Sequence, residues 1–166
     1  LDPRTRTWTP VAPLPDASSA TPGRYLHALV AMAGQLWSIG GSIRQSALSN
    51  VCYFSGGKNG KWHGRAAGLP ERPAARVFHG AAAFSLYGLD HILVVGGNVG
   101  DSGVDWSNST VIWDYNNFRW DQGPDLLVAR KFPAVAAVPV NSTGLGGAII
   151  RNSLLYVVCL LYTSDP

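Results

Sequence analysis

Residues 76–120 read RVFHGAAAFSLYGLDHILVVGGNVGDSGVDWSNSTVIWDYNNFRW, and this stretch determines the expected fold. It contains three short apolar runs, at residues 81–86, 91–95 and 111–114, and it ends at Trp120. Gly, Asn, Asp and Ser separate the runs, a pattern typical of neighbouring strands in a small antiparallel sheet. Gly96 and Gly97 directly follow the second run, and glycine allows a chain to leave a buried strand with a positive φ. The stretch therefore predicts one antiparallel sheet.

The same arrangement occurs earlier in the chain, where equivalent residues precede their counterparts by roughly 52 to 58 positions. The matched positions are Arg24, His27, Gly40, Gly41 and Trp62 in the first copy, and Arg76, His79, Gly96, Gly97 and Trp120 in the second. Partial copies stand at both ends. The Asp2-to-Trp8 spacing equals that from Asp114 to Trp120, and Arg130 begins a third Arg-led segment. A period near fifty residues, with a glycine pair and a Trp in each unit, indicates a repeat protein.

This combination resembles the kelch repeat: Arg and His before an apolar strand, a second strand ending in Gly-Gly, a third ending in Tyr-Asp, and then Trp. The resemblance implies an all-β fold, a partial β-propeller of four-stranded antiparallel kelch blades. It divides the chain into the end of a preceding blade (1–15), two blades (24–70 and 76–127) and an incomplete blade (130–158). The expected strands are 25–32, 35–39, 50–54, 60–65, 78–86, 91–95, 110–115, 119–122, 132–140 and 154–158. Two departures are visible, because Gly56 replaces the expected Asp and Pro133 stands where His is expected after Arg130.

The two ends of the chain predict a fragment. The chain begins without Met, inside a strand-three motif, and the run 154–158 is not followed by the Gly-Gly that the register requires. Residues 159–166 instead read CLLYTSDP, which resembles the translation of a sequencing-library adapter. We expect this tail to be non-native, and the alternative is a divergent native tail.

Composition excludes several functional classes. The 166 residues carry a net charge of only +3 and 14% charged residues, without the basic stripe that nucleic-acid binding needs. No apolar run approaches the roughly 18 to 20 residues of a membrane-spanning helix. The sequence therefore predicts neither a nucleic-acid partner nor a membrane span in this chain, and it leaves the compartment open.

Most of the polar and aromatic landmarks are best interpreted as structural. His27 and His79 share a repeat position, so we expect them to support a blade rather than bind a metal. Arg24, Arg76 and Arg130 also recur, and we expect each to bind backbone carbonyls of a neighbouring strand or loop. The tryptophans that end the units, Trp8, Trp62 and Trp120, are expected to pack between blades. No catalytic residue, metal site or cofactor is predicted, and Cys52 is expected to be buried in a strand.

The functional prediction rests on the loops that differ between the repeats. Resemblance to kelch proteins implies a protein–protein interaction module, and the variable connections 42–49 and 98–108 are the candidate binding loops. Within them the candidate contact residues are Arg44, Gln45, Asp101, Asp105 and Trp106. The alternatives are that these loops are only solvated connections, or that the chain belongs to an enzyme similar to galactose oxidases or sialic acid mutarotases. The sequence favours the binding module, because no ligand set for a copper oxidase can be assembled from it.

Two Asn-Ser-Thr triplets begin at Asn108 and Asn141, both in expected loops, and both match the N-glycosylation acceptor pattern. With so many Asn residues in the chain, such a match also arises by chance. Asn108 and Asn141 are therefore possible acceptor sites that the sequence alone does not decide.

Overall fold

A computed structural model of the chain describes residues 4–14, 23–64, 74–100, 106–143 and 149–158, and within these ranges the architecture is almost entirely β. The first sheet comprises β1 (Ala28–Met32), β2 (Gln35–Ile39), β5 (Val51–Ser55) and β6 (Lys61–His63). The second comprises β8 (Gly80–Leu86), β9 (Leu89–Val95), β11 (Thr110–Asp114) and β12 (Arg119–Gln122). A hairpin follows, made of β13 (Ala134–Thr143) and β14 (Ile149–Val158). The remaining elements are β3 (Ser42–Ile43), β4 (Ser46–Ala47), β7 (Arg76–Val77), β10 (Asn98–Val99) and the 3₁₀ turn η1 (Gly57–Asn59).

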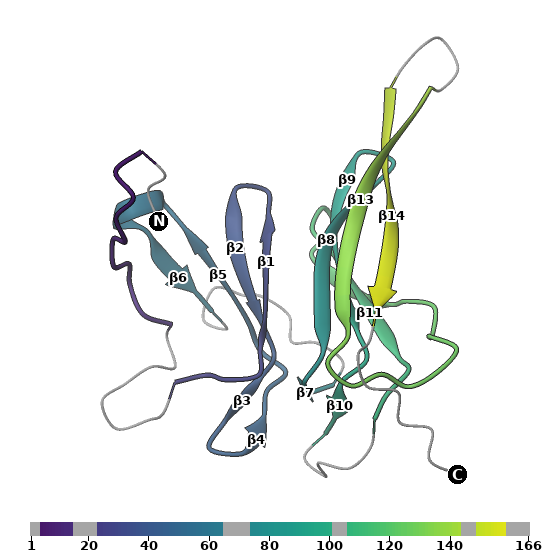
Figure 1. Cartoon of the computed structure of the whole chain (residues 1–166), viewed down its shortest axis with the longest axis horizontal. Helices are drawn as coiled ribbons and strands as arrows, with labels where there is room; N and C mark the ends of the chain where they lie inside the picture. The colour runs from purple at the N-terminus through teal and green to yellow at the C-terminus, as the bar shows by residue number, and fades with distance from the viewer. Residues whose placement is uncertain (1–3, 15–22, 65–73, 101–105, 144–148, 159–166) are drawn as a thin grey trace.

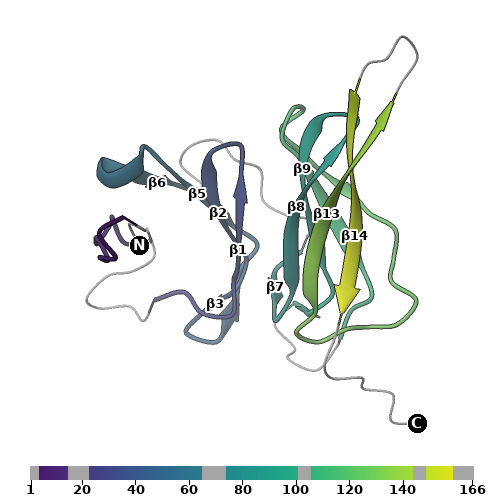
Figure 2. The same ribbon diagram turned by 45° about the horizontal axis from the view of Figure 1, so that its top comes forward.

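The two sheets have the same topology. Each pairs its strands in sequence order, β1-β2-β5-β6 in the first and β8-β9-β11-β12 in the second, with every pairing antiparallel. Figures 1 and 2 show the sheets side by side, with β1 facing β8 and the β13–β14 hairpin on the far side of β8. The first strand of each unit is thus the one closest to the next unit.

Tight turns set the register of the long hairpins. Ala33-Gly34 joins β1 to β2 and Tyr87-Gly88 joins β8 to β9, and all four residues have a positive φ. Two-residue turns of this kind match the right-handed twist of paired strands. Because glycine occupies the second position of each turn, only one of the two residues carries the steric cost of a left-handed conformation.

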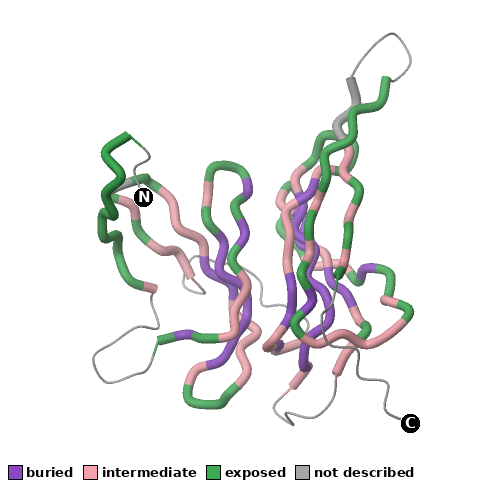
Figure 3. Tube along the Cα trace, in the orientation of Figure 1, coloured by how far each residue is buried: buried purple, intermediate pink, exposed green. Residues whose placement is uncertain are grey.

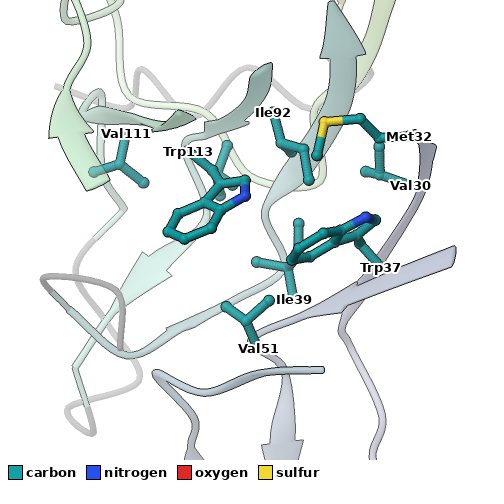
Figure 4. Packing of buried hydrophobic residues seen from close by; sticks show 9 residues of the cluster. Val30, Met32, Trp37, Ile39, Val51, Ile92, Val111 and Trp113 are labelled. Carbon is teal, nitrogen blue, oxygen red and sulfur yellow. The ribbon is translucent and has the colours of Figure 1, made fainter. Parts of the chain in front are cut away.

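The larger hydrophobic core lies between the two sheets. Trp37 of β2 and Trp113 of β11 are both almost completely buried, and their ring centroids lie 6.0 Å apart. Figure 4 shows the two indoles as neighbours in this core, tilted by 46° to each other, with aliphatic side chains around them. The aliphatic members of this core are Val30, Met32, Ile39, Val51, Ile92, Val94 and Val111.

A second, smaller core lies between the second sheet and the hairpin. Phe84, Leu93 and Val95 face away from the first core and pack against Val135 and Ala137 of β13 and Leu155 and Val157 of β14. Strand alternation therefore gives the second sheet two buried faces. The opposite face of the hairpin carries apolar residues that are exposed (Figure 3): Val138, Val140, Leu154, Tyr156 and Val158.

Most expected strands are found within two or three residues of their expected bounds. The exception is β14, which was expected at 154–158 and starts at Ile149. β1 starts at Ala28 instead of residue 25, because Leu26 has a left-handed backbone with φ of 58°. The expectation that Asn141 lies in a loop is wrong, since β13 continues to Thr143. The connection 42–49 contains a short β3–β4 hairpin that its polar, glycine-free sequence did not indicate.

The expected burial of Trp8 is wrong, while the other two tryptophans are at least partly covered. Trp8 is 81% exposed. The segment that follows it is joined to the first sheet by Trp62, whose indole N–H donates to the carbonyl of Ala12 (2.9 Å). Trp120 packs against the larger core beside Trp113, with ring centroids 5.3 Å apart. The tryptophans buried most deeply are therefore in the middle of strands.

Candidate functional site on the loop face

Two buried arginines hold the points where the chain leaves the sheets. The Nη1 group of Arg76 donates to the carbonyls of Gly96 (2.6 Å) and Ser109 (2.9 Å), and Nη2 donates to Oγ of Ser109 (2.8 Å). Arg24 repeats this geometry in the first sheet, with Nη1 3.1 Å from the carbonyl oxygen of Gly40. Burial lowers the pKa of Arg76 to about 10, so the group stays protonated at neutral pH and can donate to these carbonyls.

Backbone bonds join each sheet to the start of the next unit. The N–H of Gly41 donates to the carbonyl of Arg76 (2.9 Å), and the N–H of Gly97 donates to the carbonyl of Arg130 (2.7 Å). His79 adds a side-chain link, because its Nε2 lies 3.0 Å from the carbonyl oxygen of Ile39 in the preceding sheet. Since that oxygen can only accept, Nε2 must carry the proton.

The second glycine of each pair approaches another backbone closely. A Cβ on Gly41 would lie 2.6 Å from the carbonyl oxygen of Tyr25, and one on Gly97 would meet the carbonyl oxygen of Val77. Both glycines also have a positive φ, of 91° and 80°. Close approach and backbone conformation therefore both require glycine at these two positions.

The residues that follow β2 and β9 and the residues that begin each repeat unit lie together at one end of the sheets. We call this end the loop face. It comprises the β3–β4 hairpin, β7, β10, Trp106 and the three equivalent residues Leu26, Phe78 and Phe132. Figure 1 shows β3, β4, β7 and β10 together at the lower end of the molecule. The described parts of the two connections singled out from the sequence thus lie at the same end of the sheets, although roughly 55 residues separate the connections in the chain.

Arg44 and Gln45 form the tip of the β3–β4 hairpin. Both are exposed, and both have a positive φ (50° and 71°), which is the geometry of a type I′ turn. The backbone N–H of Gln45 donates to the hydroxyl oxygen of Tyr25 (3.1 Å), so the tip is attached to the start of the first unit. The structure therefore places these two candidate contact residues on the surface of the loop face.

Trp106 also lies on this face, at the end of the second connection. Its backbone forms a bridge with Asn98 of β10, and its ring lies 6.1 Å from the ring of Phe78. The ammonium group of Lys131 lies 4.3 Å from the centroid of the same indole. The other two candidate contact residues, Asp101 and Asp105, lie outside the described residues.

A pocket of about 240 Å³ opens on the loop face between the two units. Its walls come from the starts of both units and from the first connection: Tyr25, Leu26, Ser42, Gln45, Ala47, Val77, Phe78 and Gly100. The lining is mainly apolar, and the hydroxyls of Tyr25 and Ser42, 3.3 Å apart, supply polar groups. Convergent apolar and polar groups of this kind can receive one side chain of a binding partner.

Sequence analysis overlooked Tyr25, Phe78, Lys131 and Phe132, all of which lie on the loop face. Leu26, Phe78 and Phe132 occupy the same place in the three Arg-led segments, and each has a left-handed backbone, with φ of 58°, 57° and 50°. A signal was present, because an apolar residue stands two positions after Arg24, Arg76 and Arg130 alike. Nothing in the sequence indicated left-handed geometry at a bulky residue, which is a rare and strained combination.

The two possible glycosylation sites have different surroundings. Asn108 is exposed in the connection before β11, where its side-chain amide donates to the carbonyl of Leu126 (3.2 Å). Asn141 is exposed within β13, paired with Arg151, and is therefore not in a loop. Glycosylation of either residue stays a prediction.

The metal and membrane findings are limited to the described ranges. Among these residues no group of three or more His, Cys, Asp or Glu side chains is placed to hold a metal ion. Within the same ranges no helix has the length and apolar character needed to cross a membrane.

Comparison with known proteins supports the architecture. The structure resembles the solved structure of YjhT, a protein with a β-propeller-like fold, with a TM-score of 0.55 and 17% sequence identity. The match covers 82% of this chain and 46% of that chain, so this chain spans about half the length of its structural relative. No family model and no curated protein matches the sequence. The fold is all-β and of the β-propeller type, and the described sheets do not form a closed ring.

Proposed function

We propose that the chain is part of a kelch-type propeller that binds a protein partner through the loop face. The observation that carries this proposal is one pocket whose lining includes Ser42, Gln45 and Ala47 of the first variable connection (42–49) and Gly100 of the second (98–108), at one end of the two sheets. Loops held by a rigid scaffold are the usual location of binding residues, and clustered aromatic side chains are the usual anchors of a protein interface. The repeated contacts of Arg24 and Arg76 support the kelch assignment.

Site-specific photocrosslinking tests this proposal. A photoreactive amino acid replaces Gln45 on the loop face, and in a matched protein it replaces Tyr87, which is 75% exposed in the turn at the opposite end of the second sheet. We expect the Gln45 position, and a third probe at Trp106, to capture the same protein from an extract of the source cells. The Tyr87 position should not capture it. Capture at Tyr87 alone, or different proteins at Gln45 and Trp106, would contradict the proposal.

A further inference from the structure

Three aromatic rings on the loop face surround one ammonium group. The Nζ atom of Lys131 lies 4.3 Å from the ring centroid of Trp106, 5.4 Å from that of Phe132 and 5.6 Å from that of Phe78. All three distances are within the range over which a cation is attracted to the face of an aromatic ring. A single ring beside a cation is common in proteins, whereas three rings around one ammonium group form a cage.

The cage is built from three separate segments that the backbone fixes in place. Phe78 follows β7, Trp106 pairs with Asn98 of β10, and Phe132 precedes β13. The N–H of Phe132 donates to the carbonyl of Phe78 (3.0 Å), and the two rings meet edge to face at 4.5 Å. The rings are therefore positioned by the fold and do not depend on Lys131 alone.

Phe78 and Phe132 share a left-handed backbone with Leu26, which stands at the equivalent position of the first unit and carries no ring. This backbone conformation is therefore a feature of the repeat. What distinguishes the second and third Arg-led segments from the first is the aromatic ring at this position.

We propose that Phe78, Trp106 and Phe132 form a binding site for an alkylammonium group, such as a methylated lysine side chain of the partner. Lys131 occupies the site in the unbound chain and is displaced when the ligand enters. The chemistry follows from the occupant, because a site that holds one ammonium group among three ring faces also favours a quaternary ammonium group, which loses less hydration on entering. The inference rests on the proposed function only in that the partner supplies the cation.

The test uses choline as the probe and needs no partner protein. Binding of choline to the whole chain is measured by isothermal titration and ligand-observed NMR, with its neutral isostere 3,3-dimethylbutan-1-ol as the control ligand. We expect Lys131→Ala, which empties the cage, to bind choline roughly tenfold more tightly than the unsubstituted chain, and in preference to the neutral isostere. A second substitution in the Lys131→Ala protein, either Trp106→Leu or Phe132→Leu, should abolish the gain in choline affinity. A dispersed amide NMR spectrum shows that the double variant is still folded.

Two results would overturn the proposal: no gain in choline affinity in Lys131→Ala, or equal binding of choline and its neutral isostere. Failure of the alkylammonium site can be distinguished from failure of the proposed protein-binding function. If choline binds as expected but the photocrosslinking probes on the loop face capture no common protein, the cage stands and the protein-binding role falls. If a common protein is captured while choline does not bind, the protein-binding role stands and the cage assignment falls.

Discussion

Arg76 makes several polar contacts where the second sheet meets the loop face. Its guanidinium group is buried, donates to two carbonyls and one hydroxyl, and connects the strand exit at Gly96 to the start of β11 near Ser109. Hydrogen bonds from a charged donor contribute more than neutral ones, and their loss leaves buried carbonyls without a donor. The sequence predicted this role correctly in kind, because Arg recurs at the same place in each unit and carbonyls are its natural partners. It could not predict which carbonyls Arg76 would contact.

Replacing Arg76 should therefore destabilise the fold strongly. We expect Arg76→Met to lower the free energy of unfolding by about 3 kcal/mol or more, because several buried hydrogen bonds are lost together. The control is Arg119→Met, since Arg119 is exposed and its ion pair with Asp121 (3.1 Å) lies at the surface, where such pairs contribute about 1 kcal/mol or less. Urea unfolding of both variants measures the difference. Equal loss in the two proteins would refute the framework role of Arg76.

Asp114 gives a pH-dependent prediction at the same scale. Burial would raise the pKa of this carboxyl group, but the side-chain amide of Asn117, the backbone N–H groups of Asn117 and Asn116, and nearby His91 together lower its pKa below the usual 3.8. Because the pKa is lower in the folded chain than in the unfolded one, the stabilisation is complete above about pH 4. It is lost as the pH falls through the folded-state pKa.

We therefore expect Asp114→Asn to cost about 1–2 kcal/mol at pH 7, since the variant loses charge-assisted hydrogen bonds to the turn at Asn116 and Asn117. The difference between the two proteins should shrink as the pH is lowered below 4. Chemical unfolding at pH 7 and at pH 3 checks this, with Asp121→Asn as an exposed control. A difference that stays constant or grows on acidification would show that the carboxylate has no such role.

At the level of elements, short segments position the site more than the long strands do. The β3–β4 hairpin, the β7–β10 pair and the glycine exits bring residues 42–47, 98–100 and Trp106 to the same end of the sheets. Alternation of apolar residues and turn chemistry in the sequence predicted the eight sheet strands closely. The β3–β4 hairpin was not predicted, because its turn is Arg44-Gln45 and not a glycine-containing pair. The loop-face pocket was not predicted either, because it depends on contacts between units that a sequence does not display.

The second glycine of each pair should tolerate substitution poorly. Gly97→Ala places a methyl group against the carbonyl of Val77, in addition to the strain of a positive φ. Gly100 provides a matched control, because its φ is also positive (85°) but nothing lies within 4 Å of the position its Cβ would take. We expect Gly100→Ala to cost about 1 kcal/mol and Gly97→Ala at least about 3 kcal/mol. Thermal unfolding of the two variants separates steric overlap from strain, and similar melting temperatures would contradict the close approach.

For the whole molecule, stability depends on the layers between units. The sequence assigned the packing between units to the tryptophans that end each unit, and of these Trp120 packs against the larger core. Trp37 and Trp113 in mid-strand are buried instead, because strand alternation directs them between the sheets, while Trp8 is exposed. A sequence pattern identifies which residues are apolar, but it does not identify which neighbouring sheet covers them.

Truncation of Trp37 should weaken the contact between the two sheets. We expect Trp37→Ala to lower the free energy of unfolding by about 3–5 kcal/mol through loss of buried apolar area and the cavity left beside Trp113. Trp8→Ala, which removes an exposed ring, should change stability by less than about 0.5 kcal/mol. Calorimetric unfolding measures both. A large effect of Trp8→Ala together with a small effect of Trp37→Ala would mean that the packing between the units is different.

Amide hydrogen exchange on the chain, with and without the partner captured at Gln45, tests whether the loop face is the binding surface. If the loop face is the binding surface, exchange should slow in two separate segments, around Tyr25–Ala47 and around Val77–Trp106. The turns at the opposite end, at Tyr87-Gly88 and Asn116–Phe118, should be unchanged. Slowed exchange at those turns with no change on the loop face would contradict the central claim that the two variable connections form one binding site.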